Sequence, residues 1–346
     1  MSTLKVTNLQ HPSAASANVT LDSSGNAAFS DGITGVTSVN GGQLGGSNII
    51  INGAMECSQR GNYSSAVSLS DDTYYLDRWV SDLAGVSATI QNVSNGYLSK
   101  IKTQKLAATS SATGRLVSIQ KIEVSGYMLG VELTASAQVK SNSSDARLFL
   151  VDNTNGTVLG VQAHTGGGAF EKLIVSGTPP TSCTDLRVYV ALRGAAQENV
   201  AITSGDYFEF TEVQLEIGST PTSYQHESYG TTLQKCERYF QRSWHTASNS
   251  GNSNVYPGVV TGVAQDTGSL NAAVQFRTQL RATPTFTFYR DGVAGRLWNV
   301  NTAGTVTASL SQSWYDINGI NGMPLSGGVL TAGVRYGFDF DVDAEL

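Results

Sequence analysis

The segment from 207 to 244 most constrains the fold, because it joins a long alternating strand to the one convincing helical pattern in the chain. From Tyr207 to Ile217, polar and apolar residues alternate over most of the run, as a half-buried strand requires. Gly218 and Pro221 then interrupt the pattern. The sequence therefore predicts a strand that stops abruptly and gives way to a polar turn.

A short helix over 231–242 is predicted after this turn. Thr231 or Thr232 can cap its start, and Arg238 and Arg242 suit the negative end of the helix dipole. The apolar residues at helical spacing are Leu233, Cys236, Tyr239 and Phe240. Because a helix this short is not stable in isolation, its apolar face must be buried in its own subunit or between subunits.

The rest of the chain predicts an all-β fold. Only 14% of the residues are charged and 37 are glycine, a composition that favours short strands and tight turns. Turn-bounded apolar runs before the helix are typical of a jelly-roll-like antiparallel β-sandwich. Strands are expected there at 48–53, 87–93, 116–122, 132–139, 146–152, 170–175, 186–192 and 207–217.

Four parts follow from this pattern. They are an N-terminal extended arm (1–47), the jelly-roll-like sandwich (48–218), a connector with the short helix (219–244) and a second, small C-terminal β-sandwich (245–346). The arm contains only strand-like pieces, at Leu4–Val6, Val19–Leu21 and Ala27–Phe29. Such pieces become stable when chains intertwine or pair with the edge of another protein.

In the C-terminal region, strands are expected at 255–264, 270–276, 285–289, 295–301, 306–313 and 329–341. The chain ends in an alternating run with one aromatic face. Asp339, Asp341 and Asp343 occupy its other face, which predicts an acidic outer surface.

No motif for catalysis, metal binding or phosphate binding occurs in the sequence, which predicts a non-enzymatic protein without cofactors. Cys57, Cys183 and Cys236 are odd in number and far apart, as expected for reduced, buried thiols. A net charge of -6 without a run of Lys and Arg argues against nucleic-acid binding. No stretch approaches the roughly 20 apolar residues that a membrane-spanning helix needs, and no signal peptide is apparent. We therefore expect folding in a cytoplasm and no membrane insertion.

Ligand contacts are predicted in the C-terminal region, where aromatic residues lie beside Asn and Asp. Aromatic faces can stack on sugar rings while neighbouring polar groups bond the hydroxyls. The candidates are Trp298, Asn299, Asn301, Trp314, Tyr315 and Asp316.

Three motifs resemble proteins of one kind. The sequence VQLEIGSTPTSYQHESYGTTLQKCERYFQRSW at 213–244 resembles a segment of tail-fibre and related virion proteins of tailed bacteriophages, especially marine and cyanobacterial ones. NIIINGAMECSQRG at 48–61, with LDRW at 76–79, and FRTQLRATPTFTF at 276–288 match the same proteins. The opening of the chain is similar to the attachment segments of such fibres.

This resemblance implies a homotrimeric tail fibre, located in the virion tail and assembled in the host cytoplasm. Residues 1–47 would bind other tail or virion proteins, and the β domains would bind a host-surface glycan or protein. A capsid decoration or tail-adaptor protein with a purely architectural role is the alternative, and a fibre-borne polysaccharide depolymerase is a second one. The sandwich also looks like jelly-roll carbohydrate-binding modules, which often hold a structural calcium, here near Glu56 and Glu212. For both glutamates, a solvated or hydrogen-bonded side chain is the favoured interpretation.

Overall fold

The computed structural model describes five short N-terminal strands and residues 48–244, 259–311, 315–327 and 329–346. The chain divides into two compact units, Met1–Gly46 and Ser47–Leu346. In the first unit, β1, β2 and β3 form an antiparallel sheet, and β4 pairs with β5. These strands are β1 (Asn8–Leu9), β2 (Val19–Leu21), β3 (Ala27–Phe29), β4 (Ser38–Val39) and β5 (Gly42–Gln43). Two of the predicted pieces are thus strands, whereas Leu4–Val6 lies outside the described residues.

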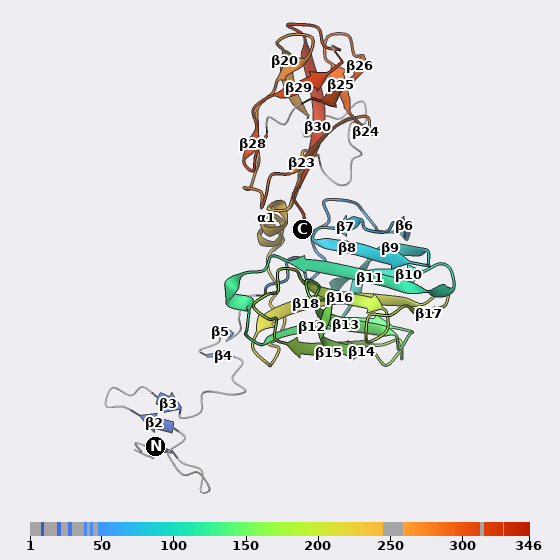
Figure 1. Cartoon of the computed structure of the whole chain (residues 1–346), viewed down its shortest axis with the longest axis vertical. Coiled ribbons are helices and arrows are strands. Elements are labelled where there is room, and N and C mark those ends of the chain that lie inside the picture. Colours follow the sequence, from blue (N-terminus) through green and yellow to red (C-terminus); the bar gives the residue numbers. More distant parts are fainter. Residues whose placement is uncertain are drawn as a thin grey trace. The chain divides into compact units, whose positions relative to one another are not determined.

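The second unit begins with two antiparallel sheets that form a sandwich (Figure 1). One sheet has six strands in the order β15-β12-β18-β10-β9-β6. The other has seven, in the order β14-β13-β16-β11-β8-β7 with β17 paired to β11. The strands are β6 (Val67–Leu69), β7 (Tyr74–Leu76), β8 (Trp79–Ala84), β9 (Ala88–Tyr97), β10 (Ile101–Ala108), β11 (Ala112–Ile122), β12 (Leu133–Ser141), β13 (Ala146–Asp152), β14 (Thr157–Ala163), β15 (Phe170–Gly177), β16 (Leu186–Leu192), β17 (Val200–Ile202) and β18 (Tyr207–Ile217). The predicted all-β fold is confirmed.

Alternate residues of the two sheets meet in one apolar core. Leu106 and Phe208 reach it from the six-stranded sheet, and Leu148 comes from the seven-stranded one. The fully buried indole of Trp79 packs edge-on against Phe210, with 5.2 Å between ring centroids. Burial of this large aromatic surface is the main force that holds the two sheets face to face.

A β-bulge in β18 changes which residues reach this core. Strict alternation would place Phe210 and Val213 on opposite faces, yet both are fully buried in the core. The pairing of β18 with β12 shifts register next to Gln138, where Glu212 has a φ of +50°. Glu212 is the extra residue of the bulge, so the alternation resumes with opposite parity beyond it. Non-glycine residues seldom adopt this conformation, and the sequence pattern did not predict it.

The predicted strand at 48–53 is wrong, because this segment forms bends and a turn. Asn52 has a φ of +60° and its side chain replaces the missing ladder bonds. Its amide nitrogen donates to the carbonyls of Cys57 at 2.8 Å and Asp77 at 3.1 Å, and its oxygen accepts the Cys57 N–H at 2.9 Å. Ile50 is still buried in the core, so the apolar run contributes to core packing although it forms no strand.

Helix α1 runs from Tyr229 to Glu237 rather than over 231–242. Its N-cap is Ser228, whose hydroxyl accepts the N–H of Thr231, so neither predicted threonine is the cap. Beyond the helix, β19 (Phe240–Arg242) pairs with the last strand of the chain, and this long-range pairing overrides the helical spacing. Within the described part of the chain, no helix is long and apolar enough to cross a membrane.

The C-terminal region has its own ten-stranded sheet, in the order β24-β23-β30-β20-β21-β29-β27. β19 and β25 also pair with β30, β26 pairs with β25, and β22 and β28 form a separate pair. The strands are β20 (Val260–Ala264), β21 (Ser269–Asn271), β22 (Val274–Gln275), β23 (Thr285–Arg290), β24 (Val293–Ala294), β25 (Arg296–Asn299), β26 (Thr305–Thr307), β27 (Ser309–Leu310), β28 (Gly319–Ile320), β29 (Met323–Ser326) and β30 (Arg335–Asp343). The expected strand at 270–276 is thus split, the one at 329–341 starts only at Arg335, and 255–258 and 312–313 lie outside the described residues.

The last strand, β30, has the predicted aromatic face but not the predicted acidic surface. Phe338 is fully buried, in a core shared with Phe286 of β23. Asp339 is also buried, at 2% exposed. Asp341 accepts the Tyr289 hydroxyl at 3.1 Å. The acidic-surface prediction is wrong because Asp339 is buried and the other two carboxylates have side-chain partners, Tyr289 for Asp341 and Arg60 for Asp343.

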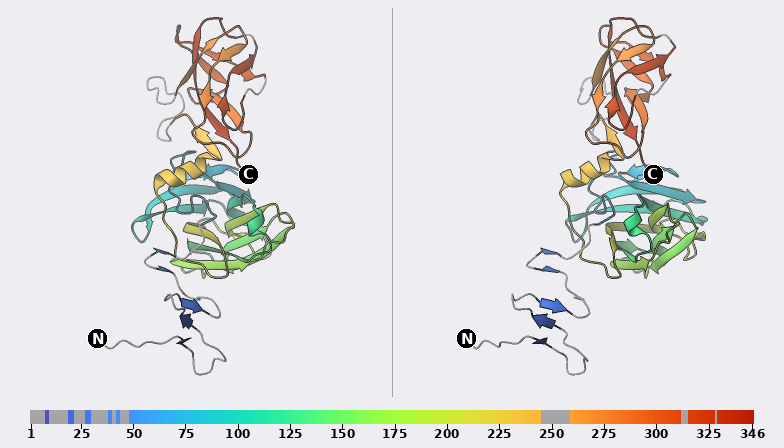
Figure 2. Two further views of the ribbon diagram at one scale, coloured as in Figure 1. Left: turned by 90° about the vertical axis from the view of Figure 1, so that its left-hand side faces the viewer. Right: turned by 60° about the vertical axis from the view of Figure 1, so that its left-hand side comes forward.

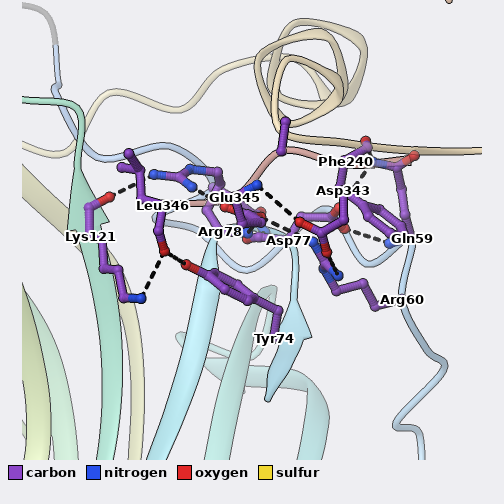
Figure 3. Close-up of polar contacts among 12 residues, drawn as sticks. Gln59, Arg60, Tyr74, Asp77, Arg78, Lys121, Phe240, Asp343, Glu345 and Leu346 are labelled. Carbon is purple, nitrogen blue, oxygen red and sulfur yellow. Dashed lines mark hydrogen bonds and ion pairs between the residues drawn. The ribbon is translucent and has the colours of Figure 1, made fainter. Parts of the chain in front are cut away.

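The sandwich and the C-terminal region meet in a buried polar cluster, which we call the joint (Figure 3). Helix α1 lies between the two parts in all three views of Figures 1 and 2. The joint comprises Gln59, Arg60, Tyr74, Asp77, Arg78 and Lys121 of the sandwich, and Phe240, Asp343, Glu345 and Leu346.

Glu345 is the centre of the joint, with a side chain only 3% exposed. It forms ion pairs with Arg78, whose side chain is 2% exposed, and with Arg60 at 3.2 Å. Arg60 also binds Asp343 at 2.9 Å. Burial raises the pKa of Glu345, and the two guanidinium groups oppose that rise. The charges are thus withdrawn from water and depend on one another.

Aromatic rings hold both guanidinium groups in place. The Arg78 guanidinium lies 3.6 Å from the Tyr239 ring centroid, and that of Arg60 lies 3.7 Å from Phe240. These rings follow α1 directly, so the segment after the helix fixes the arginines of the sandwich.

Further hydrogen bonds complete the joint (Figure 3). Gln59 donates to Asp77 at 2.9 Å and to the Phe240 carbonyl at 3.0 Å. The Leu346 oxygen accepts from Lys121 at 2.7 Å and from the Tyr74 hydroxyl at 2.9 Å. Nearby, the thiols of Cys57 and Cys236 contact each other, and all three cysteines are free and buried.

The motifs that resemble phage fibre proteins converge on this joint. Gln59 and Arg60 belong to the motif at 48–61, Asp77 and Arg78 to its LDRW part, and Tyr239 and Phe240 to the motif at 213–244. The motif at 276–288 supplies Arg281, which donates to the carbonyls of Ala344 at 3.0 Å and Glu345 at 2.9 Å. The residues behind the resemblance therefore build the connection between two β regions.

We predict that Arg78→Met strongly destabilises the chain, because it leaves Glu345 buried with a single guanidinium partner. The expected loss is about 3–5 kcal/mol, measured by urea denaturation. Lys235→Met is the control, since it removes a pair with Glu227 in which both side chains are 38% exposed. That variant should change stability by less than about 1 kcal/mol. Equal effects of the two substitutions would contradict the role of the joint.

Asp341 should make stability depend on pH. Burial beside the Tyr289 hydroxyl raises the pKa of Asp341 from 3.8 to about 6. The folded chain therefore binds this proton more tightly than the unfolded chain. The resulting stabilisation is complete below pH 3.8 and is lost as the pH rises through about 6.

Asp341→Asn should accordingly be more stable than the wild type at pH 8, by roughly 1–3 kcal/mol, and should lose that advantage near pH 4. Urea denaturation of both proteins at the two pH values measures the difference. An advantage that is the same at both pH values would show that the carboxyl group does not titrate in this range.

Candidate functional site

Three of the sequence-predicted ligand residues lie at the end of β25 and in the turn that follows it. Trp298 is half-buried, and the Arg290 guanidinium lies 5.0 Å from its ring centroid. The Asn299 side-chain oxygen accepts the N–H of Asn301 at 3.0 Å, which closes a local turn. Asn301 itself is exposed.

The second predicted group follows β27. Tyr315 is half-buried against the C-terminal core, with its ring centroid 5.7 Å from that of Phe286. The exposed Asp316 accepts the N–H of Asn318 at 2.7 Å, a bond that lowers the pKa of Asp316. Trp314 lies outside the described residues. The C-terminal ligand site stays a prediction, and its described members support turns and core packing.

The two carboxylates considered for calcium each have a basic partner. Glu56 lines a pocket of about 80 Å³ and forms an ion pair with Lys102 at 3.2 Å. Glu212 contacts the Nε2 atom of His226, which also lines the pocket, at 3.2 Å. Over the described ranges, no group of three or more His, Cys, Asp or Glu residues is arranged to hold a metal ion.

A row of polar and aromatic side chains crosses the outer face of the six-stranded sheet. The pairing registers bring one residue from each of five neighbouring strands, β9, β10, β18, β12 and β15, to the same level. We call this set the transverse row; its members are Gln91, Lys105, Glu209, Lys140 and Phe170. Along its strand each member has the parity opposite to that of the core residues, so its side chain points away from the core.

Glu209 is the fixed centre of the row and is only 4% exposed. One carboxylate oxygen accepts the Thr103 hydroxyl at 2.5 Å, and the other lies 3.6 Å from the Lys140 ammonium. The Lys140 side chain remains 34% exposed. The Glu209 carboxylate is thus held in place beneath the Lys140 ammonium, which is accessible from solvent.

Each lysine of the row lies over an aromatic ring. The Lys105 nitrogen is 4.4 Å from the centroid of Tyr207, the next outward residue of β18, and the Lys140 nitrogen is 5.6 Å from that of Phe170. Both rings are half-buried. Cation–π attraction positions the ammonium groups and leaves their charge in place.

The tip of the β9–β10 hairpin covers part of the row. Tyr97 packs edge-on against Phe170, with 4.9 Å between centroids, although three strands separate β9 from β15. Gly96 lies directly over Thr103 and Glu209. A Cβ atom at Gly96 would come within 2.1 Å and 2.6 Å of their side-chain oxygens, so only glycine fits.

The turn of this hairpin has an unusual composition. Leu98 and Ser99 have φ values of +48° and +56°, the pair of positive values found at the centre of a type I′ turn, and the Lys100 N–H closes this turn by donating to the Tyr97 carbonyl at 3.1 Å. Asn and Gly normally occupy these positions, so the backbone here is strained. Leu98 is 69% exposed and contributes an apolar tip beside the row.

This surface combines the groups that a polyhydroxylated ligand needs. Half-buried rings offer flat apolar faces, and the glutamate, the lysines and an amide offer directional hydrogen bonds. The chemistry therefore suits sugar binding.

Sequence reasoning missed this face for a physical reason. The sequence predicted the strands that contain Glu209 and Phe170 but did not assign Glu209 to a face of the sheet. The strand at 101–108 that contains Lys105 was not predicted, and pairing registers between distant strands are not encoded in local periodicity. Proximity of the five residues follows only from the sheet order.

Comparison with known proteins places the chain in no established group. No family profile matches it, and no curated protein sequence matches it. Among solved structures, the enzymatically active domain of tailspike protein 4 of bacteriophage CBA120 aligns at 14% identity over 49% of this chain and 21% of that chain, with a TM-score of 0.33.

Two carbohydrate-binding modules align over similar shares of the chain. TmCBM61, solved with β-1,4-galactotriose, aligns at 12% identity over 49% of this chain and 99% of that chain, with a TM-score of 0.32. The family 11 module of a cellulosomal cellulase of Clostridium thermocellum aligns at 12% identity over 47% and 98%, with a TM-score of 0.28. At such TM-scores the alignments carry no argument about function.

Gly96→Ala should displace the hairpin tip from the row, because the added methyl group overlaps two buried side chains. We expect a loss of about 1–3 kcal/mol in the free energy of unfolding, measured by denaturation. Gly126→Ala is the matched control, since nothing lies within 4 Å of its added Cβ. Equal stabilities for the two variants would mean that the tip does not pack on Glu209.

Proposed function

We propose that this protein is a component of a bacteriophage tail fibre that binds host-surface glycans through the transverse row, without cleaving them. The observation that carries the proposal is the row itself, in which aromatic rings, a fixed carboxylate and two ammonium groups share one outer sheet face. The resemblance of the joint motifs to phage fibre proteins supports the virion assignment.

The remaining parts of the proposal follow from this role. Three copies in one fibre would present three rows, and several weak sites acting together bind far more tightly than one. Residues 1–47 would bind other tail proteins, as the resemblance implies. The protein would be assembled in the host cytoplasm and act in the virion tail.

The proposal is tested by binding of the full chain to susceptible cells and to an array of surface glycans. Phe170→Leu removes the ring in the row and Tyr207→Leu removes the ring beside it, and both variants keep an apolar side chain. Each should weaken binding about ten-fold, equivalent to about 1.4 kcal/mol, as expected for an aromatic contact in an interface.

Tyr127→Leu provides the control, because Tyr127 is 59% exposed and lies outside the row, in the short helix Gly126–Met128. Binding that survives the row substitutions but is abolished by Trp298→Ala would move the site to the C-terminal region. No binding of the wild-type chain to any cell or glycan would contradict adhesion and favour an architectural protein. Loss of polymer viscosity during incubation would identify a depolymerase.

A further inference from the structure

The positive charge of the transverse row suggests which class of glycan it binds. The chain as a whole has a net charge of -6, yet the row contains two lysines and one glutamate. Lys172, on the neighbouring level of β15, adds a further ammonium group to this side of the sheet. The row is therefore a basic strip on an acidic protein, a distribution that attracts anions locally.

The two lysines differ in how far a neighbouring carboxylate neutralises their charge. The Lys140 ammonium shares the carboxylate of Glu209 at 3.6 Å. Lys105 forms no ion pair with any residue in the described ranges, and only the Tyr207 ring holds its ammonium. A lysine ammonium has three donors and no acceptor, so an anionic ligand oxygen satisfies it better than a hydroxyl does.

The spacing of the lysines suits a polymer. β18 separates β10 from β12, so the backbones of Lys105 and Lys140 lie about 10 Å apart, twice the distance between neighbouring strands. A chain of sugars lying across the strands would meet an aromatic ring and an ammonium group at each of these two positions. The two ammonium groups follow one another along the row, each with a ring beside it, and this arrangement matches a ligand that repeats flat rings and anionic groups.

We propose that the ligand is an acidic polysaccharide, whose carboxylate or sulfate groups pair with Lys105 and Lys140 while its sugar rings contact Tyr207 and Phe170. This inference rests on the proposed function and specifies the ligand class of the same site. Charge pairing at a solvent-accessible surface also predicts that affinity falls as salt concentration rises.

The test is calorimetric titration of the full chain with two sets of hexasaccharides. One set is acidic, made of galacturonate, mannuronate or sulfated galactose, and the other is neutral, made of glucose, galactose or mannose. We expect binding to at least one acidic hexamer. Lys105→Gln should weaken it roughly ten-fold and reduce its dependence on salt, whereas Lys105→Arg should retain it.

Lys235→Gln is the charge-matched control, because Lys235 lies on α1 and pairs with Glu227; it should bind like the wild type. Melting curves of all variants exclude loss of folding as the cause. Binding of neutral hexamers alone, or acidic binding that Lys105→Gln leaves unchanged, would overturn this inference while the proposed function stands. Binding of neither set at the row would overturn both.

Discussion

The buried ion pair between Arg78 and Glu345 is the interaction on which the arrangement of the main unit depends. Withdrawing both charges from water is unfavourable unless each finds its partner and its remaining hydrogen bonds. Arg60, Asp343 and the ring of Tyr239 supply these contacts. Because one partner belongs to the sandwich and the other follows the last strand, the pair forms only when both β regions have folded and met.

Local features of the sequence predicted much of the fold. Alternation located β13, β16 and most of β18, and the aromatic face of β30 was evident from its spacing. The predictions that failed concern features that depend on contacts with residues distant in the sequence. The helix ends at Glu237 because Phe240 pairs with β30, and residues 48–53 bend because Asn52 bonds to a loop 25 residues away. The bulge at Glu212 reverses the parity of a strand without any glycine to signal it.

The motifs that carry the family resemblance and the residues of the candidate site are different sets. The motifs are continuous runs, since the joint needs neighbouring residues such as Asp77 and Arg78 to reach opposite partners. The transverse row takes one residue from each of five strands, so it leaves no motif. For this reason sequence reasoning found a resemblance to phage fibre proteins but did not find the transverse row, and its ligand prediction rested on the aromatic residues that stand out locally.

The composition of the row also affects how such a protein can adapt. The side chains of the row point away from the core, so the solvent-accessible members can be exchanged without disturbing the packing between the sheets. Five positions scattered along the gene thus form one adjustable surface. Under the proposed function, single nucleotide changes would alter the bound glycan one contact at a time, while the joint holds the scaffold in the same shape.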